Sequence, residues 1–216
     1  MGYNSFYNRC IKPVIGFVLA LILLLILWPV YLVIALLVAI ESGFPVIYSP
    51  QRGGYRNKPF RIYKFRSMVK NADKIGGGTT ALNDPRITKV GNFLRKTKLD
   101  EIPQLFNILR GTMSFIGPRP ELLRYVEQYE GEEKLILEVR PGITDFSSIE
   151  FINLDEVVGA GNADETYEKY VLKKKNQLRI KYAKEVSFTT DFKLFMRTVW
   201  GVIKKALGFI LLNKHK

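Results

Sequence analysis

The sequence predicts an α-rich α+β fold that is attached to a membrane. Three features support this: a long uncharged apolar stretch near the start, short β-prone runs followed by helical patterns, and a basic amphipathic stretch near the end. The chain has 216 residues, which is enough for one compact domain and a membrane element. We expect the membrane element in residues 1–41, the compact domain in residues 42–190 and an amphipathic helix in residues 191–216.

The predicted membrane element is Pro13–Ile40, which contains no charged residue over 28 positions. A helix needs about 20 apolar residues to cross a bilayer core, so this stretch is long enough. A cleaved signal peptide explains it less well, because the apolar core of such a peptide has about 7–15 residues. A buried core helix also explains it less well, since the sequence has no second apolar stretch of similar length to pack against it.

The residues of this stretch leave two membrane topologies open. Pro29 lies near the middle, where it removes a backbone hydrogen bond and kinks the helix. Basic residues lie on both flanks, at Arg9, Lys12, Arg52, Arg56, Lys58 and Arg61. Lys and Arg concentrate on the cytoplasmic side, so this pattern favours a re-entrant helix that bends at Trp28-Pro29 and returns to the same face. The alternative is an ordinary single span with a tolerated proline.

The C-terminal stretch Asp191–Leu212 has the pattern of an amphipathic helix. Its apolar residues recur at helical spacing, at Phe192, Phe195, Met196, Val199, Ile203, Ala206, Leu207 and Ile210. Lys193, Arg197 and Lys204 form the opposite stripe. A basic helix of this kind can lie in the membrane interface. Packing on the core of the domain is the alternative.

The elements between these two ends are short. The β-prone runs Val46–Tyr48 and Phe60–Tyr63 are separated by Gly and Pro, which suggests a hairpin. We expect helices at Phe93–Lys98, at Leu99–Leu109 with Pro103 in the first turn, at Glu121–Val139 and at Ala163–Lys184. No linker is long enough to divide this region into two domains.

Composition limits the chemistry of the chain. The formal net charge is +13, which suits an anionic partner such as nucleic acid, a phosphorylated substrate or an anionic lipid surface. The single cysteine, Cys10, excludes an intrachain disulfide. The single histidine, His215, is next to the last residue, which argues against a histidine general base or a zinc site.

Three clusters of residues suggest chemistry. Asp100 and Glu101 are adjacent carboxylates at a predicted helix start, where the helix dipole favours charge and Mg²⁺ is a natural companion. Arg119 stands between two prolines, which would hold its planar fork on a stiff loop for phosphate binding. Further positive charge comes from Lys64, Arg66, Arg95 and Arg140. These residue types alone predict only a membrane-associated protein that binds an anion.

Four longer motifs are more specific. The segments KFRSM (64–68), DPRIT–VG (84–91), FLRKTKLDEIPQLFNILRGTMSFIGPRPE (93–121) and RPGIT (140–144) resemble the bacterial sugar transferase family, the monotopic phosphoglycosyl transferases. The similarity covers roughly residues 10 to 200. In that family the membrane helix is re-entrant and bends at a proline, so the resemblance favours the re-entrant topology and a small cytosolic catalytic domain.

The resemblance implies an activity and a mechanism. Such enzymes move a sugar 1-phosphate from a UDP-sugar to polyprenyl (undecaprenyl) phosphate and release UMP, as the first membrane step of glycoconjugate or exopolysaccharide assembly. By resemblance, Asp100 attacks the β-phosphate to form a phosphosugar-aspartate, Glu101 assists the second substrate, and Mg²⁺ binds at Asp100. Binding of the phosphates is expected at Lys64, Arg66, Arg95, Arg119 and Arg140.

The resemblance also implies a location, the cytoplasmic face of the bacterial inner membrane. The chain departs from the family pattern at two positions: Trp28 replaces a frequent Ser before the membrane proline, and Asp145 replaces a usual Gly. Asp145 could mark a different sugar choice or be a harmless substitution. The rival functions are a membrane phosphatase or pyrophosphatase and a non-catalytic scaffold. Nucleic-acid binding is not expected, and a homodimer is the alternative to a monomer.

Overall fold

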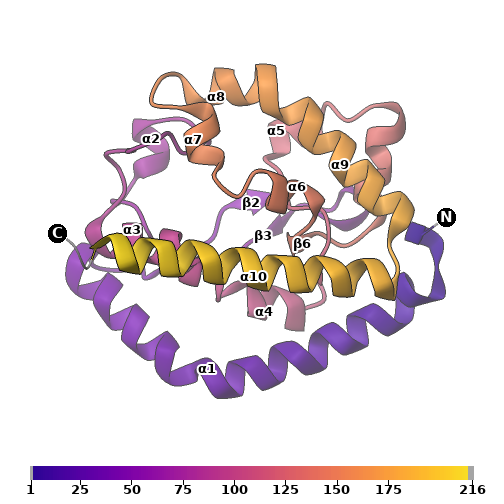
Figure 1. Cartoon of the computed structure of the whole chain (residues 1–216), viewed down its shortest axis with the longest axis horizontal. Helices are drawn as coiled ribbons and strands as arrows, with labels where there is room; N and C mark the ends of the chain where they lie inside the picture. Colours follow the sequence, from indigo (N-terminus) through magenta and orange to yellow (C-terminus); the bar gives the residue numbers. More distant parts are fainter. Residues whose placement is uncertain (1, 214–216) are drawn as a thin grey trace.

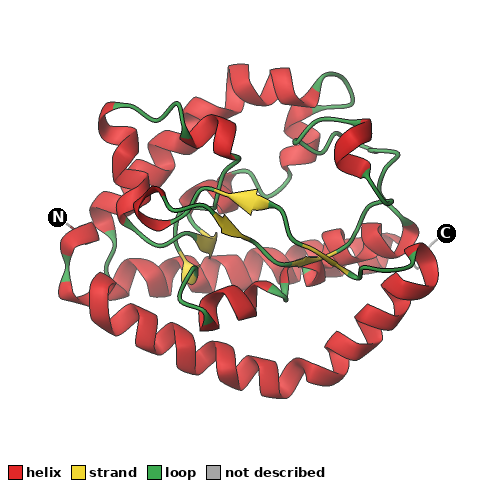
Figure 2. Cartoon of the chain, turned by 180° about the vertical axis from the view of Figure 1, so that it is seen from behind, coloured by secondary structure: helices red, strands yellow, loops and turns green. Residues whose placement is uncertain are grey.

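The computed structural model describes residues 2–213, so His215 lies outside the described residues. The fold is rich in helices, and the longest are α1 (Lys12–Ser42), α9 (Leu172–Glu185) and α10 (Phe188–Asn213). The shorter helices are α2 (Ala72–Ile75), α3 (Lys89–Thr97), α4 (Gln104–Leu109), α5 (Leu123–Val126), α6 (Phe146–Glu150), α7 (Leu154–Val158) and α8 (Ala163–Thr166). Figures 1 and 2 show α1 along one edge of the molecule, with the other elements above it.

Helix α1 is the apolar stretch predicted from the sequence. It has 31 residues with Pro29 inside, and it bends near its middle so that both arms rise towards the same body (Figure 1). Among the described residues, Tyr7–Ser42 is long and apolar enough to cross a membrane, and only 11% of its most apolar window is buried. Trp28 is 59% exposed. The outer surface of α1 is therefore available to lipid along most of its length.

Both ends of α1 are bonded to the body of the protein. At the first end, the Lys12 ammonium lies 2.9 Å from the carboxylate of Asp191 in α10. At the second end, the Arg66 guanidinium donates to the carbonyl oxygen of Ser42 at 2.7 Å. Nearby, the carboxylate of Glu41 accepts the backbone N–H of Val90 at the start of α3. These contacts fix the ends of the apolar helix to one rigid unit.

The β-structure consists of short two-stranded pieces. Strands β1 (Ile47–Tyr48) and β4 (Lys64–Phe65) pair antiparallel, as do β2 (Gln51–Arg52) and β3 (Phe60–Arg61). The two pairs share one register, so they form the interrupted hairpin that the sequence predicts. Strands β5 (Ser114–Ile116) and β6 (Gly142–Thr144) pair in parallel and join two segments that are distant in sequence.

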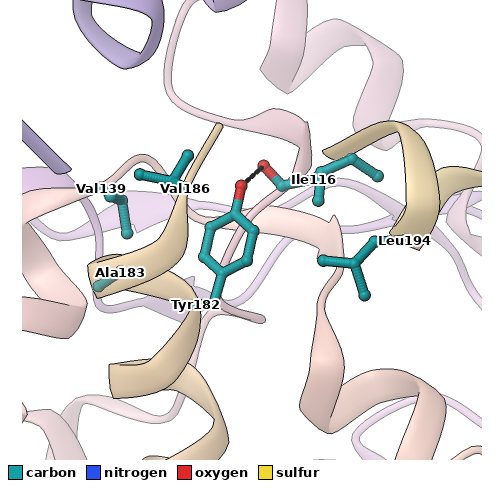
Figure 3. Close-up of a cluster of buried hydrophobic side chains, with 6 residues drawn as sticks. All are labelled: Ile116, Val139, Tyr182, Ala183, Val186 and Leu194. Carbon is teal, nitrogen blue, oxygen red and sulfur yellow. Dashed lines mark hydrogen bonds between the residues drawn. The ribbon is translucent and has the colours of Figure 1, made fainter. Parts of the chain in front are cut away.

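The core of the domain is formed by several small apolar clusters. Figure 3 shows one of them, in which the ring of Tyr182 lies among Ile116, Val139, Ala183, Val186 and Leu194. The Tyr182 hydroxyl lies 3.2 Å from the carbonyl oxygen of Ile116, so this buried polar group has a partner. A second cluster joins Ala20 of α1 to Leu105 and Ile108 of α4. The apolar helix therefore packs directly on the domain.

The structure corrects one predicted helix. The sequence predicts a single helix over residues 121–139, but this region forms α5 and a separate 3-10 helix, Gly131–Glu138. Helix α5 ends at Val126, and the 3-10 helix begins only at Gly131, whose φ of +51° is a left-handed conformation. The expected helix at Ala163–Lys184 is found as α8, a π-helical turn and α9 in succession.

Helix α10 presents most of its predicted apolar stripe to the outside. The exposed apolar side chains include Phe188, Phe192, Phe195, Met196, Val199, Trp200 and Ile203. On the other side, Asp191 and Leu194 are buried against the domain. Packing on the core leaves this part of the stripe, as far as Ile203, uncovered and available for a lipid surface. The predicted stripe residues Ala206, Leu207 and Ile210 lie outside the side chains that the structure describes.

Candidate active site

The domain contains a cavity of about 690 Å³. The chain segments around it come from the hairpin, the glycine-rich loop 76–83, α3, the loop 119–122, residues 143–155, α9 and α10. Of the residues predicted from the sequence, five line the cavity together: Lys64, Arg95, Asp100, Glu101 and Arg119. The candidate site is therefore assembled from segments that are far apart in the sequence.

The carboxylate pair is placed by a sharp turn between two helices. Helix α3 ends at Thr97, and Lys98 adopts a left-handed conformation with φ of +61°. Asp100 and Glu101 follow in a 3-10 turn (Leu99–Glu101) that leads into α4. The carbonyl oxygen of the next residue, Ile102, accepts a hydrogen bond of 2.6 Å from the hydroxyl of Tyr31 in α1. The apolar helix thus contacts the segment that carries both carboxylates.

Glu101 is the centre of an ion-pair network. Arg119 binds its carboxylate through both terminal nitrogens, one of them at 3.0 Å, and the Lys64 ammonium lies 3.3 Å from it. Burial alone would raise the pKa of Glu101, but Arg119 and Lys64 hold that pKa well below its usual value. Glu101 is therefore ionised in this site, and it keeps two cations at the cavity wall.

Arg119 is held on the stiff loop that the two prolines predict. Its Nη1 also donates to the carbonyl oxygen of Ile143 in β6 at 2.8 Å. The loop leaves β5 at Gly117, where a Cβ atom would lie 2.3 Å from the carbonyl oxygen of Arg140. Only glycine fits this close approach of the parallel strands. Interactions with Glu101 outweigh burial and raise the pKa of Arg119, so its charge is permanent.

Asp100 differs from its neighbour. Its side chain is buried, and its Oδ1 has no hydrogen-bond partner among the described residues. Burial raises its pKa, and the charge of Glu101 adds to that effect, while Lys64 and Arg95 oppose it. A buried acceptor without a hydrogen-bond partner destabilises the fold unless a ligand or an ion binds to it. Asp100 is therefore the group in this cavity that is best suited to react or to bind a cation.

The glycine-rich loop forms one rim of the cavity. Arg95 donates to the hydroxyl of Thr80 at 2.8 Å. The carboxylate of Asp164 accepts the backbone N–H groups of Gly78 at 3.1 Å and Thr79 at 2.7 Å. These hydrogen bonds lower the pKa of Asp164 to about 2 against the opposing effect of burial. The loop is therefore held in place from both sides.

Two predicted phosphate-binding residues lie elsewhere. Arg66 is bonded to the end of α1, at Ser42 and Gly43, and does not line the cavity. Arg140 donates to the carbonyl oxygen of Gly111 at 3.2 Å and lies over the ring of Tyr55. Their positions correct the expectation that all five basic residues surround one phosphate site. Arg66 and Arg140 instead donate to backbone carbonyl oxygens of neighbouring segments.

The sequence pattern does not single out several residues that line the cavity. Lys175 and Tyr167 come from the lysine-rich helical region, and Thr198 and Lys205 come from the inner side of α10. A spacing of four residues places Tyr167, Val171, Lys175, Arg179 and Ala183 along one line of a helix, and all five are buried. The alignment of Lys175 with apolar residues is the one signal in the sequence that indicates its burial.

The cavity carries few metal-ligating side chains. Among the described residues, no group of three or more His, Cys, Asp or Glu side chains could hold a metal ion. Asp100 nevertheless offers a carboxylate oxygen without a partner. Mg²⁺ commonly takes one or two protein carboxylates and completes its shell with phosphate oxygens and water. The residues present therefore fit a Mg²⁺ ion that binds together with a phosphorylated substrate.

Known sugar-phosphate transferases are similar to this chain over most of its length. The model of the bacterial sugar transferase family matches residues 7–205. The UDP-glucose:undecaprenyl-phosphate glucose-1-phosphate transferase of Escherichia coli (strain K12) is 42% identical over 205 residues, which cover 92% of this chain and 42% of that protein. A putative undecaprenyl-phosphate N-acetylgalactosaminyl 1-phosphate transferase of Bacillus subtilis (strain 168) is 45% identical over 122 residues, which cover 56% of this chain and 68% of that protein.

The match covers most of this chain but less than half of the longer relatives. The aligned region is about 42% of the Escherichia coli relative and 42% of a Klebsiella pneumoniae relative with the same name. The family match, in contrast, extends over nearly all of this chain and includes the cavity, the carboxylate pair and the apolar helix. The chain belongs to the bacterial sugar transferase family.

Proposed function

We propose that the chain is a phosphoglycosyl transferase, which moves a sugar 1-phosphate from a UDP-sugar to polyprenyl (undecaprenyl) phosphate and releases UMP. The relatives carry names of this kind. The observation that carries the proposal is the buried Asp100 carboxylate with an unpartnered oxygen, in a cavity that also contains Lys64, Arg95 and Arg119. Such a cluster suits a diphosphate next to a nucleophile.

The reaction would proceed in two displacements. A carboxylate oxygen of Asp100 forms a bond to the β-phosphorus, and the bond from that phosphorus to the bridging oxygen breaks, so UMP leaves. A phosphate oxygen of polyprenyl phosphate then attacks the phosphosugar-aspartate. Asp100 is released as a carboxylate, and the product is a polyprenyl diphosphate sugar. Splitting one transfer into two steps is ordinary covalent catalysis.

The remaining residues would supply charge and position. Arg95 and Arg119 would bind the phosphates of the donor, and their charge offsets the negative charge on the transferring group. Glu101 would assist the polyprenyl phosphate, and it already holds Arg119 and Lys64 at the cavity. Mg²⁺, held by Asp100 and the substrate phosphates, would neutralise phosphate charge when bound.

We infer that α1 is re-entrant and that the domain lies on the cytoplasmic face of the bacterial inner membrane. The support is that both ends of α1 are bonded to one body, at Lys12 and at Ser42, and that the helix, which contains Pro29, bends near its middle (Figure 2). The exposed apolar stripe of α10 would lie in the interface on the same side. UDP-sugars are available on the cytoplasmic face.

Cysteine labelling tests this topology. On a Cys10→Ser background, Ser5→Cys and Pro50→Cys should both be protected in spheroplasts and both be labelled by an impermeant thiol reagent in inverted vesicles. Lys58→Cys, on an exposed residue of the domain, is the matched control. Labelling of positions 5 and 50 from opposite sides would contradict the re-entrant helix and favour a single span.

The activity is tested by measuring UMP release from a panel of UDP-sugars, with and without polyprenyl phosphate. Turnover should require both substrates, stop with EDTA and return with excess Mg²⁺. A membrane phosphatase or pyrophosphatase would instead turn over steadily without the acceptor. A non-catalytic scaffold would show no turnover with any member of the panel.

A further inference from the structure

Two groups of residues that differ in chemistry line the cavity. The phosphate group consists of Asp100, Arg95 and Arg119. The second group, which we call the distal compartment, consists of Leu122, Phe151, Tyr167 and Lys175. Leu122, Phe151 and Tyr167 belong to one apolar cluster, while Glu121 and Arg179 supply charge next to the Tyr167 hydroxyl. A cavity of this kind selects a flat or apolar group with a few polar atoms.

Lys175 is the unusual residue in the distal compartment. Its side chain is only 6% exposed, and its ammonium lies 5.0 Å from the centre of the Tyr167 ring and 6.0 Å from that of Phe151. Its contact with the Tyr167 hydroxyl is long, at 3.5 Å. The ammonium therefore keeps hydrogen-bonding capacity, because it carries three donors.

Glu121, whose charge acts on Lys175, is bonded to other residues. Glu121 is bonded to Arg179 at 2.9 Å and to the hydroxyl of Tyr167 at 2.5 Å. Among the described residues, no ion pair within 4.0 Å includes Lys175. Burial, with repulsion from Arg179 and Arg119, lowers the pKa of Lys175 to about 7, although Glu121 and Asp145 oppose this. A buried amine in this setting gains from an oxygen acceptor in the cavity.

The distal compartment also depends on Asp145, the residue that departs from the family pattern. Asp145 is fully buried and does not line the cavity. Its carboxylate accepts the backbone N–H of Ser148 and the hydroxyls of Ser147 and Ser148, all at 2.7 to 2.8 Å to Oδ1. It therefore begins α6 and orients the segment that leads to Phe151. Asp145 is a positioning residue for this wall.

The sugar and the uracil base of a UDP-sugar need different surroundings in a binding site. A hexose carries several hydroxyls, which would lose hydrogen bonds against Leu122, Phe151 and Tyr167. Uracil is planar, has a face that can stack on an aromatic ring, and presents carbonyl oxygens at its edge. The polar lining residues Asn83 and Asn92 suit the hydroxyls better.

We propose that the distal compartment binds the uracil base of the donor, with Lys175 donating to a uracil carbonyl oxygen and Phe151 and Tyr167 flanking the ring. This inference rests on the proposed UDP-sugar donor. It assigns the nucleotide to α9 and residues 148–152, and the sugar to the side of α3. The residue that recognises the base would therefore be Lys175, which lies 75 positions after Asp100 in the sequence.

Calorimetric titration of UMP and of UDP-sugar into the full chain in nanodiscs tests the proposal, with every protein carrying Asp100→Asn so that UDP-sugar binds without reacting. Lys175→Met should weaken both ligands by the same factor, about tenfold or more, because a hydrogen bond from a charged donor is lost. The thermal midpoint should not fall, since methionine removes a buried amine and keeps the volume. Lys173→Met, an exposed lysine on the same helix, is the matched control and should bind like wild type.

Each outcome of the titration supports or overturns the assignment of the base. Weaker UDP-sugar binding with unchanged UMP binding would assign Lys175 to the sugar and overturn the proposal, and so would unchanged binding of both ligands. If Lys175→Met does not fold, Phe151→Leu provides the same test, with a loss of UMP affinity of several-fold expected. A wild-type chain that binds neither UMP nor UDP-sugar would contradict the proposed function itself, which is a different result.

Discussion

Asp100→Asn should lower UMP release from the donor by about 10⁴-fold or more while the protein stays folded, as expected when a nucleophile is removed. The amide has nearly the shape of the carboxylate but cannot form the phosphosugar intermediate. Burial disfavours a charged Asp100 and raises its pKa, so a neutral amide should not destabilise the domain. Activity is measured with purified chain in detergent or nanodiscs, and folding by the thermal midpoint.

Intact-protein mass spectrometry gives a second measurement. With UDP-sugar and no polyprenyl phosphate, the wild-type chain should gain the mass of a sugar phosphate, and Asp100→Asn should not. Asp73→Asn, on an exposed residue outside the cavity, is the control and should keep both activity and adduct. Full activity of Asp100→Asn, or an adduct on that variant, would refute the covalent mechanism.

The parts of the fold that could be predicted from the sequence are those with strong periodicity. The apolar helix, the interrupted hairpin and α10 lie where the pattern indicates them, and α3 begins at Lys89, before the predicted start at Phe93. The single helix predicted at residues 121–139 is wrong because helical propensity is a weak local preference, which the break between Val126 and Gly131 overrides. The parallel pairing of β5 with β6 joins distant segments, and a local pattern carries no information about it.

The candidate site could be predicted only in part, for a similar reason. Asp100, Glu101 and Arg119 belong to one continuous motif, and the structure brings them together. Arg66 looks equivalent to Lys64 in the sequence, but the chain turns away from the cavity after β4, so Arg66 meets the end of α1 instead. Lys175 is hidden among neighbouring lysines, because its burial depends on how α9 packs.

The position of the apolar helix depends on a buried network at its first end. The Asp191 carboxylate accepts from the hydroxyl of Tyr7 at 2.8 Å and from the hydroxyl of Tyr182 at 2.6 Å, and it pairs with Lys12. Lys12 and Asp191 are 7% and 6% exposed. A buried ion pair seldom stabilises a fold more than a pair of apolar side chains would. Removing one partner is costly, however, because the other charge stays buried and unpaired. The network therefore specifies how α1 meets α9 and α10.

A double-mutant cycle on this pair should show strong coupling. Asp191→Asn leaves Lys12 buried without a counter-charge and should cost about 3–5 kcal/mol of unfolding free energy, which corresponds to a fall of about 10 °C in the thermal midpoint. Lys12→Met should also destabilise, since it leaves the carboxylate uncompensated. The double variant should recover much of the loss. The amide oxygen can accept from one of the two tyrosine hydroxyls, the amide nitrogen can donate to the other, and no charge remains buried.

The exposed ion pair Lys184–Glu132 supplies the matched control for this cycle. Lys184→Met should change stability little, since exposed pairs contribute about 0–1 kcal/mol. If the losses at Lys12 and Asp191 simply add, the two residues act independently and the network does not hold α1. If the double variant is stable yet inactive, the charges matter for the orientation of α1 relative to Asp100, which the contact of Tyr31 with Ile102 transmits. Stability and activity measured on the same four proteins separate these roles.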